Sequence, residues 1–437
     1  MSLRAQRWAP LALAALLAHS AAALAADEEF KFDASEFEKK PFELGGYLEF
    51  RPERFTLNRG STGYKLNYPA GFSRDSLERT TGALQLDGKY VSGIVSARFR
   101  SYSQIQRDAV VKDESNRFYE AALSLRPNPG LTVDIGKQAL QWGKGYAFNP
   151  VGFVQRRKDP NDPELAREGY TAVSADFIRN FDGPLQTVAF TPVLLPVGAD
   201  VNDDFGKTGY VNFAGKLYFL HRDTDIDFVY MGKGSRPARY GVDFSRNLQS
   251  NLEVHGEWAR TLDAEKPVVD AAGRVSTQRG SQVSTLLGMR YLTERDTTWI
   301  VEYYRNGTGY SKGEIGDFYG FVDRAFAGAG APGGSALVQS ALNLARSGYG
   351  QPNPMRNYLY VQASQKEPFD ILYFTPSVTV IANLDDRSLS VTPDLLYTGI
   401  KNLELRLRMS FLVGGGGTDF GEKPNSNRIE LRARFYF

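Results

Sequence analysis

Hydrophobic and polar positions alternate with a period of two in stretches of about 10 to 13 residues along most of the chain. The last twelve residues, Ser426 to Phe437, show the pattern most clearly. Ile429 and Leu431 lie on one face, and Arg432 and Arg434 lie on the other. Because side chains of a β-strand point alternately to its two faces, this segment is predicted to be a strand with one apolar face and one charged face.

The same alternation recurs over the whole chain and predicts about 18 strands, long enough to cross a membrane at a tilt. Every second connection is short, and the intervening ones are longer, above all 142–169, 262–279 and 307–354. Outer-membrane barrels have this alternation of short periplasmic turns and long external loops. We therefore predict an all-β fold, a closed antiparallel transmembrane β-barrel of about 18 strands with short helices in long external loops. The alternative is a large secreted β-sandwich pair or a propeller, although the chain lacks the repeat of roughly 40 residues that a propeller requires.

The N-terminus has the three regions of a secretory signal peptide. Arg4 and Arg7 precede an apolar stretch, and Ala23-Leu24-Ala25 provides a small-x-small cleavage pattern. We predict a signal peptide over 1–25, a periplasmic N-terminal arm over 26–42 and the barrel over 43–437. Hydrophobic and polar residues alternate too weakly in this arm to tell whether it is a periplasmic arm or a plug of the barrel.

Composition narrows the function. The 437 residues include no cysteine, which excludes disulfides, thiolate metal sites and cysteine-bound clusters. Lys and Arg number 52 against 50 Asp and Glu, and removing the predicted signal peptide takes two arginines and no acidic residue. The mature chain is then formally neutral, so nucleic acid is not an expected partner.

The signal peptide, the alternating strands and the terminal Phe437 together resemble the outer-membrane barrels of diderm bacteria. That resemblance implies an outer-membrane location, contact with outer-membrane lipids and recognition of Phe437 by the barrel-assembly machinery. About 18 strands with an arginine-rich interior resemble the alginate-export porins. The segment Gly136 to Gly145 is similar to a stretch of poorly characterised proteobacterial barrels that accompany envelope exporters, which adds a periplasmic or inner-membrane exporter as a candidate partner.

Function in such a barrel resides on the inward-facing residues of the strands, because porins of 16 to 18 strands enclose an aqueous lumen. The apolar face of each strand is taken to face lipid, so the other face points into the lumen. The basic residues on that inward face are predicted to be Arg51, Arg98, Arg100, Arg406, Arg408, Arg428, Arg432 and Arg434. Guanidinium groups bind carboxylates and phosphates, so this wall favours anions. With only Glu49, Glu404 and Glu430 counted beside it, the wall is predicted to keep a basic excess. The alternative is that these charges pair across strands and rigidify the wall.

The opposite side of the lumen is predicted to be acidic. Its residues are Asp227, Asp243, Glu253, Glu257 and Glu302. His255 lies between two of them and could in principle bind a metal or relay a proton. A lone lumenal histidine among carboxylates is more often polar lining, so we predict no catalytic residue, no metal and no cofactor, and the protein is not expected to be an enzyme.

Two long loops are predicted to constrict the pore. The first contributes Trp142, Lys144, Arg156, Arg157 and Lys158, and its Asp159-Pro160 and Asp162-Pro163 steps could open a short helix. The second contributes Leu337 and Leu342 on an amphipathic helix over 335–346. That helix is expected to fold into the lumen or cap its mouth, with packing on neighbouring loops outside the pore as the alternative.

The predicted function is an outer-membrane, porin-like channel for passage or export of anionic solutes or an acidic polymer. The alternative is a non-conducting barrel that acts as a scaffold or partner in a trans-envelope transport complex.

Overall fold

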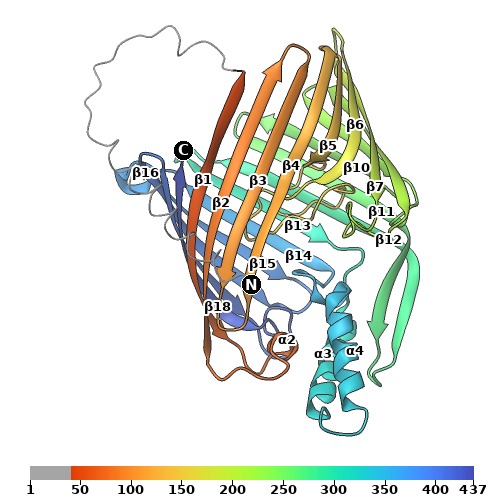
Figure 1. Ribbon diagram of the computed structural model, residues 1–437, viewed down its shortest axis with the longest axis vertical. Coiled ribbons are helices and arrows are strands. Elements are labelled where there is room, and N and C mark those ends of the chain that lie inside the picture. The colour runs from red at the N-terminus through yellow and green to blue at the C-terminus, as the bar shows by residue number, and fades with distance from the viewer. Residues whose placement is uncertain (1–40) are drawn as a thin grey trace, which may run out of the picture. The chain divides into compact units, whose positions relative to one another are not determined.

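A computed structural model describes residues 41–437, and the predicted signal peptide and nearly all of the predicted arm lie outside the described residues. Phe42 to Phe437 form one compact unit. Its eighteen strands form a single antiparallel sheet that closes on itself into a barrel (Figure 1). The predicted all-β barrel is confirmed.

Each strand pairs with its neighbours in sequence, and β1 also pairs with β18. The strands are β1 (Phe42–Leu57), β2 (Ser76–Ser92), β3 (Val95–Arg107), β4 (Lys112–Asn128), β5 (Leu131–Gln138), β6 (Tyr170–Asn180), β7 (Leu185–Val197), β8 (Tyr210–His221), β9 (Thr224–Met231), β10 (Arg239–Gln249), β11 (Leu252–Val269), β12 (Val275–Leu292), β13 (Thr297–Arg305), β14 (Asn357–Gln365), β15 (Phe374–Asn383), β16 (Leu389–Ile400), β17 (Leu403–Val413) and β18 (Asn425–Tyr436).

The closing seam brings the two ends of the described chain together. Glu49 of β1 lies opposite Arg434 of β18, and Arg434 also lies opposite Glu404 of β17. Strands β17, β18, β1, β2 and β3 are therefore consecutive around the ring. The strands that carry the predicted arginines are β17, β18, β1 and β3, with β2 between the last two.

The outside of the barrel is apolar and its inside is charged, the reverse of a water-soluble protein. On β18, Ile429 and Leu431 are exposed, whereas Glu430 and Arg432, which alternate with them along the strand, are buried. An exterior of large apolar side chains suits contact with lipid tails, because a transmembrane barrel keeps its polar residues in the lumen.

The two ends of the barrel differ. At one end, which we call the turn end, β1 begins, β18 ends and the connections are short. The opposite end, the loop end, carries the helices α2 (Thr62–Asn67), α3 (Lys312–Ala327) and α4 (Gly334–Arg346), which Figure 1 shows extending beyond the strands. Within residues 41–437, no helix has the length and apolar character needed to cross a membrane.

One predicted loop is instead mostly strand. The segment 262–279 continues the β11–β12 hairpin to Val269 and Val275, leaving a short turn at its tip. The register shifts between Thr261 and Ala264, where Asp263 adopts a positive φ of 48°. A bulge at this point lets the strand pairing continue beyond the rim of the barrel. Because the bulge interrupts the regular register, the alternation of hydrophobic and polar residues weakens there.

Candidate functional site

The connection between β5 and β6, residues 139–169, crosses the barrel interior, and we call it the inner loop. Its residues bond to inward-facing side chains of β11 and β13 on one side and of β17 and β18 on another. Strands β5, β11 and β17 are six strands apart around the ring, so the inner loop is held at three separate places. The predicted constriction by this loop therefore has a structural basis.

Two buried carboxylates hold the first half of the inner loop. Glu257 of β11 accepts hydrogen bonds from the backbone N–H groups of Lys144, Gly145 and Val151, at 2.8, 2.7 and 3.1 Å. Glu302 of β13 accepts from the backbone N–H groups of Tyr146 and of Ala147, the latter at 2.9 Å. Five backbone N–H groups of the loop thus find their acceptors on two side chains of the wall, so these contacts fix the loop to the wall.

The glycines of the Gly143-Lys144-Gly145 sequence make this close approach possible. Gly143 has a φ of +95°, which other residues rarely adopt, and a Cβ there would lie 2.6 Å from Oε1 of Glu257. A Cβ on Gly145 would lie 2.3 Å from the carbonyl oxygen of Phe148. The motif is thus explained by backbone packing against a carboxylate.

The remaining predicted acidic residues lie in the same wall. Lys144 Nζ is 3.0 Å from Asp227 and 4.0 Å from Asp243, and the Tyr146 hydroxyl donates to Glu253 at 2.7 Å. His255 Nε2 is 3.0 Å from Glu302. The described residues contain no group of three or more acidic, histidine or cysteine side chains placed to hold a metal ion. The acidic wall is thus largely covered by the inner loop.

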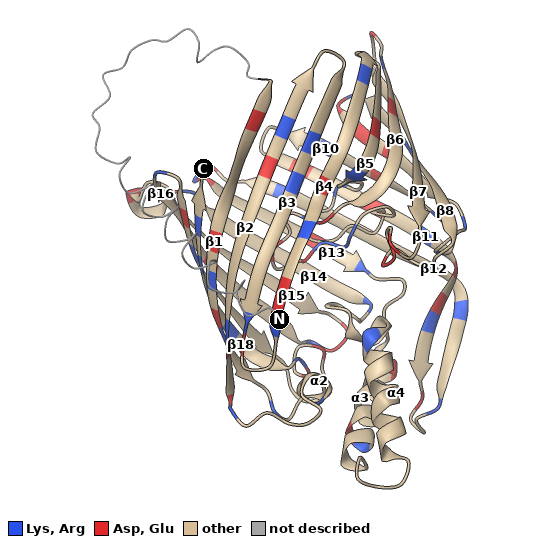
Figure 2. Cartoon of the chain, in the orientation of Figure 1, with Lys and Arg blue, Asp and Glu red and all other residues tan. Residues whose placement is uncertain are grey.

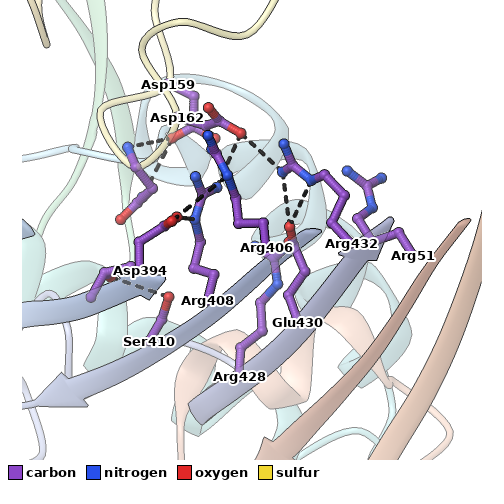
Figure 3. A network of polar contacts seen from close by, with 12 residues as sticks. Arg51, Asp159, Asp162, Asp394, Arg406, Arg408, Ser410, Arg428, Glu430 and Arg432 are labelled. Atoms are coloured by element: carbon purple, nitrogen blue, oxygen red, sulfur yellow. Dashed lines mark hydrogen bonds and ion pairs between the residues drawn. The ribbon is translucent and has the colours of Figure 1, made fainter. Parts of the chain in front are cut away.

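On the opposite wall, Asp162 at the far part of the inner loop binds two arginines. Its Oδ2 accepts from Arg408 and Arg432, each at 3.0 Å (Figure 3). Burial alone would raise the pKa of Asp162, but the two guanidinium groups lower it to about 2. Asp162 therefore stays ionised at neutral pH and ties the loop to β17 and β18.

Each of the eight predicted pore-lining arginines has a carboxylate oxygen within 4.0 Å. Figure 2 shows basic and acidic positions on neighbouring strands of this wall. The carboxylates are Glu49, Glu53, Asp87, Glu120, Asp134, Asp162, Asp394, Glu404 and Glu430. Nine carboxylates thus neutralise eight arginines, namely Arg51, Arg98, Arg100, Arg406, Arg408, Arg428, Arg432 and Arg434. The predicted basic excess is wrong, and the alternative of charges paired across strands is the one observed.

The predicted loop residues have different roles. Trp142 is buried in an apolar cluster with Phe153 and Tyr170, so it packs the loop onto the wall. Arg157 donates to the side chain of Gln351 in the long β13–β14 connection. Lys158 donates to the backbone carbonyl of Gly145 and braces the inner loop internally.

Arg156 also belongs to the inner loop and forms ion pairs with Asp204 and Glu168. The short helix predicted at the Asp-Pro steps is absent, because residues 159–168 form turns and extended chain. Asp159 and Asp162 use their oxygens for turn and wall contacts, through Asn161 and the two arginines, rather than for a helix start.

The predicted amphipathic helix exists as α4, but it does not enter the lumen. Its buried residues Ala341 and Leu344 belong to a core shared with α3, whereas Leu337 is 47% exposed and Leu342 is half-buried. Figure 1 shows α3 and α4 side by side beyond the strands at the loop end. Leu337 and Leu342 therefore lie outside the lumen, and α4 packs on the neighbouring helix α3 at the loop end, as in the alternative of packing on neighbouring loops.

Two cavities flank the inner loop. One of about 790 Å³ lies toward the turn end, between the inner loop and the arginine wall, and includes Tyr47, Arg434 and Glu404. The other, of about 1210 Å³, opens at the loop end, and we call it the outer vestibule. The charged residues of the outer vestibule are Arg156, Arg157, Lys158, Lys207, Lys233, Arg236, Arg239, Arg279, Asp204, Asp263 and Glu265.

The outer vestibule is basic, unlike the arginine wall. Its eight cationic side chains face three carboxylates. Arg156 pairs with Asp204, and Arg279 pairs with Glu265 at 3.0 Å. Among residues 41–437, the other six cations have no carboxylate oxygen within 4.0 Å. Sequence reasoning missed most of these residues because they lie in loops or at strand ends, where alternation gives no direction.

Comparison with known proteins supports the fold. No protein-family model matches the chain, and no curated protein matches it. The solved bacterial outer-membrane porins OccAB1 of Acinetobacter baumannii and OccK5 of Pseudomonas aeruginosa are 12% and 10% identical, with TM-scores of 0.52 and 0.51. Each alignment covers 90% of this chain, and 96% and 98% of the respective porin. OprD of P. aeruginosa is 11% identical with a TM-score of 0.50, over 92% of this chain and 97% of OprD. At these identities the likeness shows that the chain has the porin-type barrel fold.

Proposed function

We propose that the protein is a porin-like channel in the outer membrane of a diderm bacterium, with a preference for small anionic solutes. The observation that carries the proposal is the arrangement of the two cavities, which flank an inner loop inside a closed barrel with an apolar exterior. A channel needs a polar interior and a lipid-compatible outside, and this barrel combines the two.

The anion preference rests on the outer vestibule rather than on the arginine wall. Fixed charges at a channel mouth raise the local concentration of ions of opposite sign. The arginine wall contributes little net field because its carboxylates neutralise it, while the vestibule retains six cations that have no ion pair among the described residues. The inner loop crosses the path, which favours small solutes over an acidic polymer.

The proposed setting follows from the same fold. The apolar exterior contacts outer-membrane lipids, and Phe437 at the end of the chain serves recognition by the barrel-assembly machinery. An inner-membrane or periplasmic exporter remains a proposed partner that would dock at the turn end.

One observation favours the second candidate, a non-conducting scaffold barrel. The inner loop is held at three places by buried carboxylates and arginines, which restricts its movement. If the loop closes the lumen, the protein would act through its envelope partners.

Planar-bilayer recording of the refolded full chain under a salt gradient tests the proposal. We expect discrete openings and a reversal potential with the sign of anion selectivity, weakening as salt rises because the fixed charges are screened. Silence from a folded, heat-modifiable barrel would overturn the channel proposal and favour the scaffold. Openings without anion selectivity would overturn the assigned role of the outer vestibule.

A further inference from the structure

Three arginines from three separate segments converge on the outer vestibule. Arg157 comes from the inner loop, Arg236 from the β9–β10 connection and Arg239 from the first residue of β10. The folding of the inner loop into the barrel brings Arg157 toward the other two. The juxtaposition is thus produced by tertiary structure rather than by local sequence.

None of these three guanidinium groups has a carboxylate partner among the described residues. Other arginines of the same vestibule do, since Arg156 pairs with Asp204 and Arg279 with Glu265. Nε of Arg239 is buried and has no hydrogen-bond partner. A buried donor without a partner costs free energy, so its persistence points to an acceptor that the folded chain does not itself supply.

The hydrogen bonds that the three groups do make leave most of their donors available. Arg157 donates to the Gln351 side chain, and Arg236 donates to the backbone carbonyl of Phe205. Each guanidinium carries five N–H donors in a rigid fork. One fixed contact therefore positions the fork of Arg157 and that of Arg236 without saturating either.

Aromatic rings set the positions of two of the forks. The guanidinium carbon of Arg236 lies 3.9 Å from the centroid of the Phe205 ring, and that of Arg239 lies 5.6 Å from the centroid of Phe153. Phe205 and Phe153 are buried in the apolar cluster that also packs the inner loop. The cations are thus held on a rigid apolar support, which reduces the entropy cost of binding a ligand.

The three positive charges also act on one another. Burial lowers the pKa of Arg236; Tyr170 and Asp204 oppose this shift, and the charge of Arg157 adds to it. Arg239 lies within the fields of both Arg157 and Arg236. Like charges held together in a partly desolvated site repel, and an anion placed between them would remove that repulsion.

We propose that Arg157, Arg236 and Arg239 form a binding site for a doubly negative solute, one that carries either two carboxylates or a phosphate group. Guanidinium forks match the planar oxygen pairs of both groups, and three forks offset more than one unit of negative charge. The inference rests on the proposed channel function and deepens it, because the site would select divalent oxyanions at the loop-end entrance.

Current block in the planar bilayer tests the site, with inorganic phosphate and succinate as separate probes added to one side at a time. We expect concentration-dependent block by at least one probe, stronger from the loop end than from the turn end. R157Q, R236Q and R239Q should each raise the half-blocking concentration about tenfold or more, because each removes a charge-assisted contact. Stronger block by phosphate than by succinate, or the reverse, identifies the preferred group.

The matched control is R279Q, which removes a cation of the same vestibule that is already paired with Glu265. It should leave the half-blocking concentration within about twofold of the wild-type value. R239K provides a second variant, which keeps the positive charge and loses the forked guanidinium group. It should retain the ion selectivity of the channel and weaken the current block by the two probes. Equal weakening by R279Q and R239Q, or full block in R239K, would overturn the three-arginine site.

Titration calorimetry of phosphate and succinate into the refolded, full-length barrel in detergent separates this proposal from the channel proposal. Binding that R239Q abolishes in a barrel that does not conduct would refute the channel and retain the site. Conduction by a barrel that binds neither probe would retain the channel and refute the site.

Discussion

At the residue scale, Glu257 shows how a single carboxylate organises a loop. It is buried, and its two oxygens accept three backbone N–H groups from residues 144–151. Substituting Glu257→Gln keeps the size of the side chain but removes the charge and turns one oxygen into a donor that faces other donors. We expect the inner loop to loosen and single-channel conductance to increase, while heat modifiability shows that the barrel still folds.

A control for that substitution is Glu114→Gln, which alters an exposed pair with Lys112 at the start of β4, outside the outer vestibule. It should leave the conductance unchanged because exposed ion pairs contribute little. Identical conductance in wild type and Glu257→Gln would contradict the anchoring role of Glu257.

Asp162 gives the second residue-scale prediction, a pH dependence. Its pKa is lowered to about 2, below the value in the unfolded chain, so its contribution is complete above pH ~4 and disappears as pH falls toward 2. We expect the Asp162 anchor to remain intact between pH 8 and 5. Asp162→Asn should release it at every pH, so its conductance at pH 7 should differ from that of wild type.

Open-channel conductance of both proteins across this pH range provides the measurement. If wild type converted to the Asp162→Asn conductance near pH 6, the strong pairing of Asp162 with Arg408 and Arg432 would be contradicted.

At the scale of the element, alternation predicts strands well because the physical cause is local. Each strand presents one face to lipid and one to the lumen, so the inward direction of Arg432 and Arg434 could be derived from their neighbours. Glu53 lies on β1 two residues after Arg51 and could have been placed in the wall by the same alternation. The other neutralising carboxylates were missed for two reasons. Asp87, Glu120 and others come from strands that were not included in the wall, and Asp162 comes from a loop whose path no periodic pattern specifies.

The helix α4 illustrates a related limit. Its existence follows from a 3.6-residue pattern, but which neighbour covers its apolar face depends on α3, which alternation did not predict. Leu337 is consequently exposed, while Leu344 packs in the shared core. An amphipathic pattern indicates that the apolar face of a helix packs against another element, but it does not indicate which element that is.

Pairing within the arginine wall predicts unequal effects of similar substitutions. Arg408 is 6% exposed and binds Asp162 and Asp394, so Arg408→Gln removes one guanidinium partner from each of these two carboxylates. Removing one member of a buried pair costs about 3–5 kcal/mol. Arg100→Gln, at a side chain 35% exposed, should cost about 1 kcal/mol or less.

Urea unfolding of the two variants, refolded in the same lipid, measures this difference. Equal free energies of unfolding for Arg408→Gln and Arg100→Gln would show that the wall is not stabilised by its buried pairs.

At the scale of the whole molecule, net charge is a poor guide to the lumen. The predicted mature chain is neutral, yet its charges are separated in space. The arginine wall is balanced by carboxylates, the acidic wall is covered by the inner loop, and the outer vestibule is basic. Selectivity depends on the charge that a solute meets, so it could not be derived from composition.

Orientation in the membrane decides which compartment the basic vestibule faces. Outer-membrane barrels keep both termini and their short turns in the periplasm. By this rule the loop end, with α3 and α4, faces outward, and the vestibule is the entrance for solutes from outside the cell. Absence of cysteine from the chain makes this testable with single introduced thiols.

Ser335→Cys places a thiol at the exposed start of α4, and Asp182→Cys places one in the exposed β6–β7 turn at the turn end. A membrane-impermeant maleimide applied to intact cells should label Ser335→Cys and spare Asp182→Cys, whereas permeabilising the outer membrane should expose both. The unsubstituted chain is the control for background labelling. Labelling of Asp182→Cys alone in intact cells would place the vestibule in the periplasm. The same six cations would then concentrate anions at the periplasmic mouth, so this result decides in which compartment the basic vestibule lies before any solute is identified.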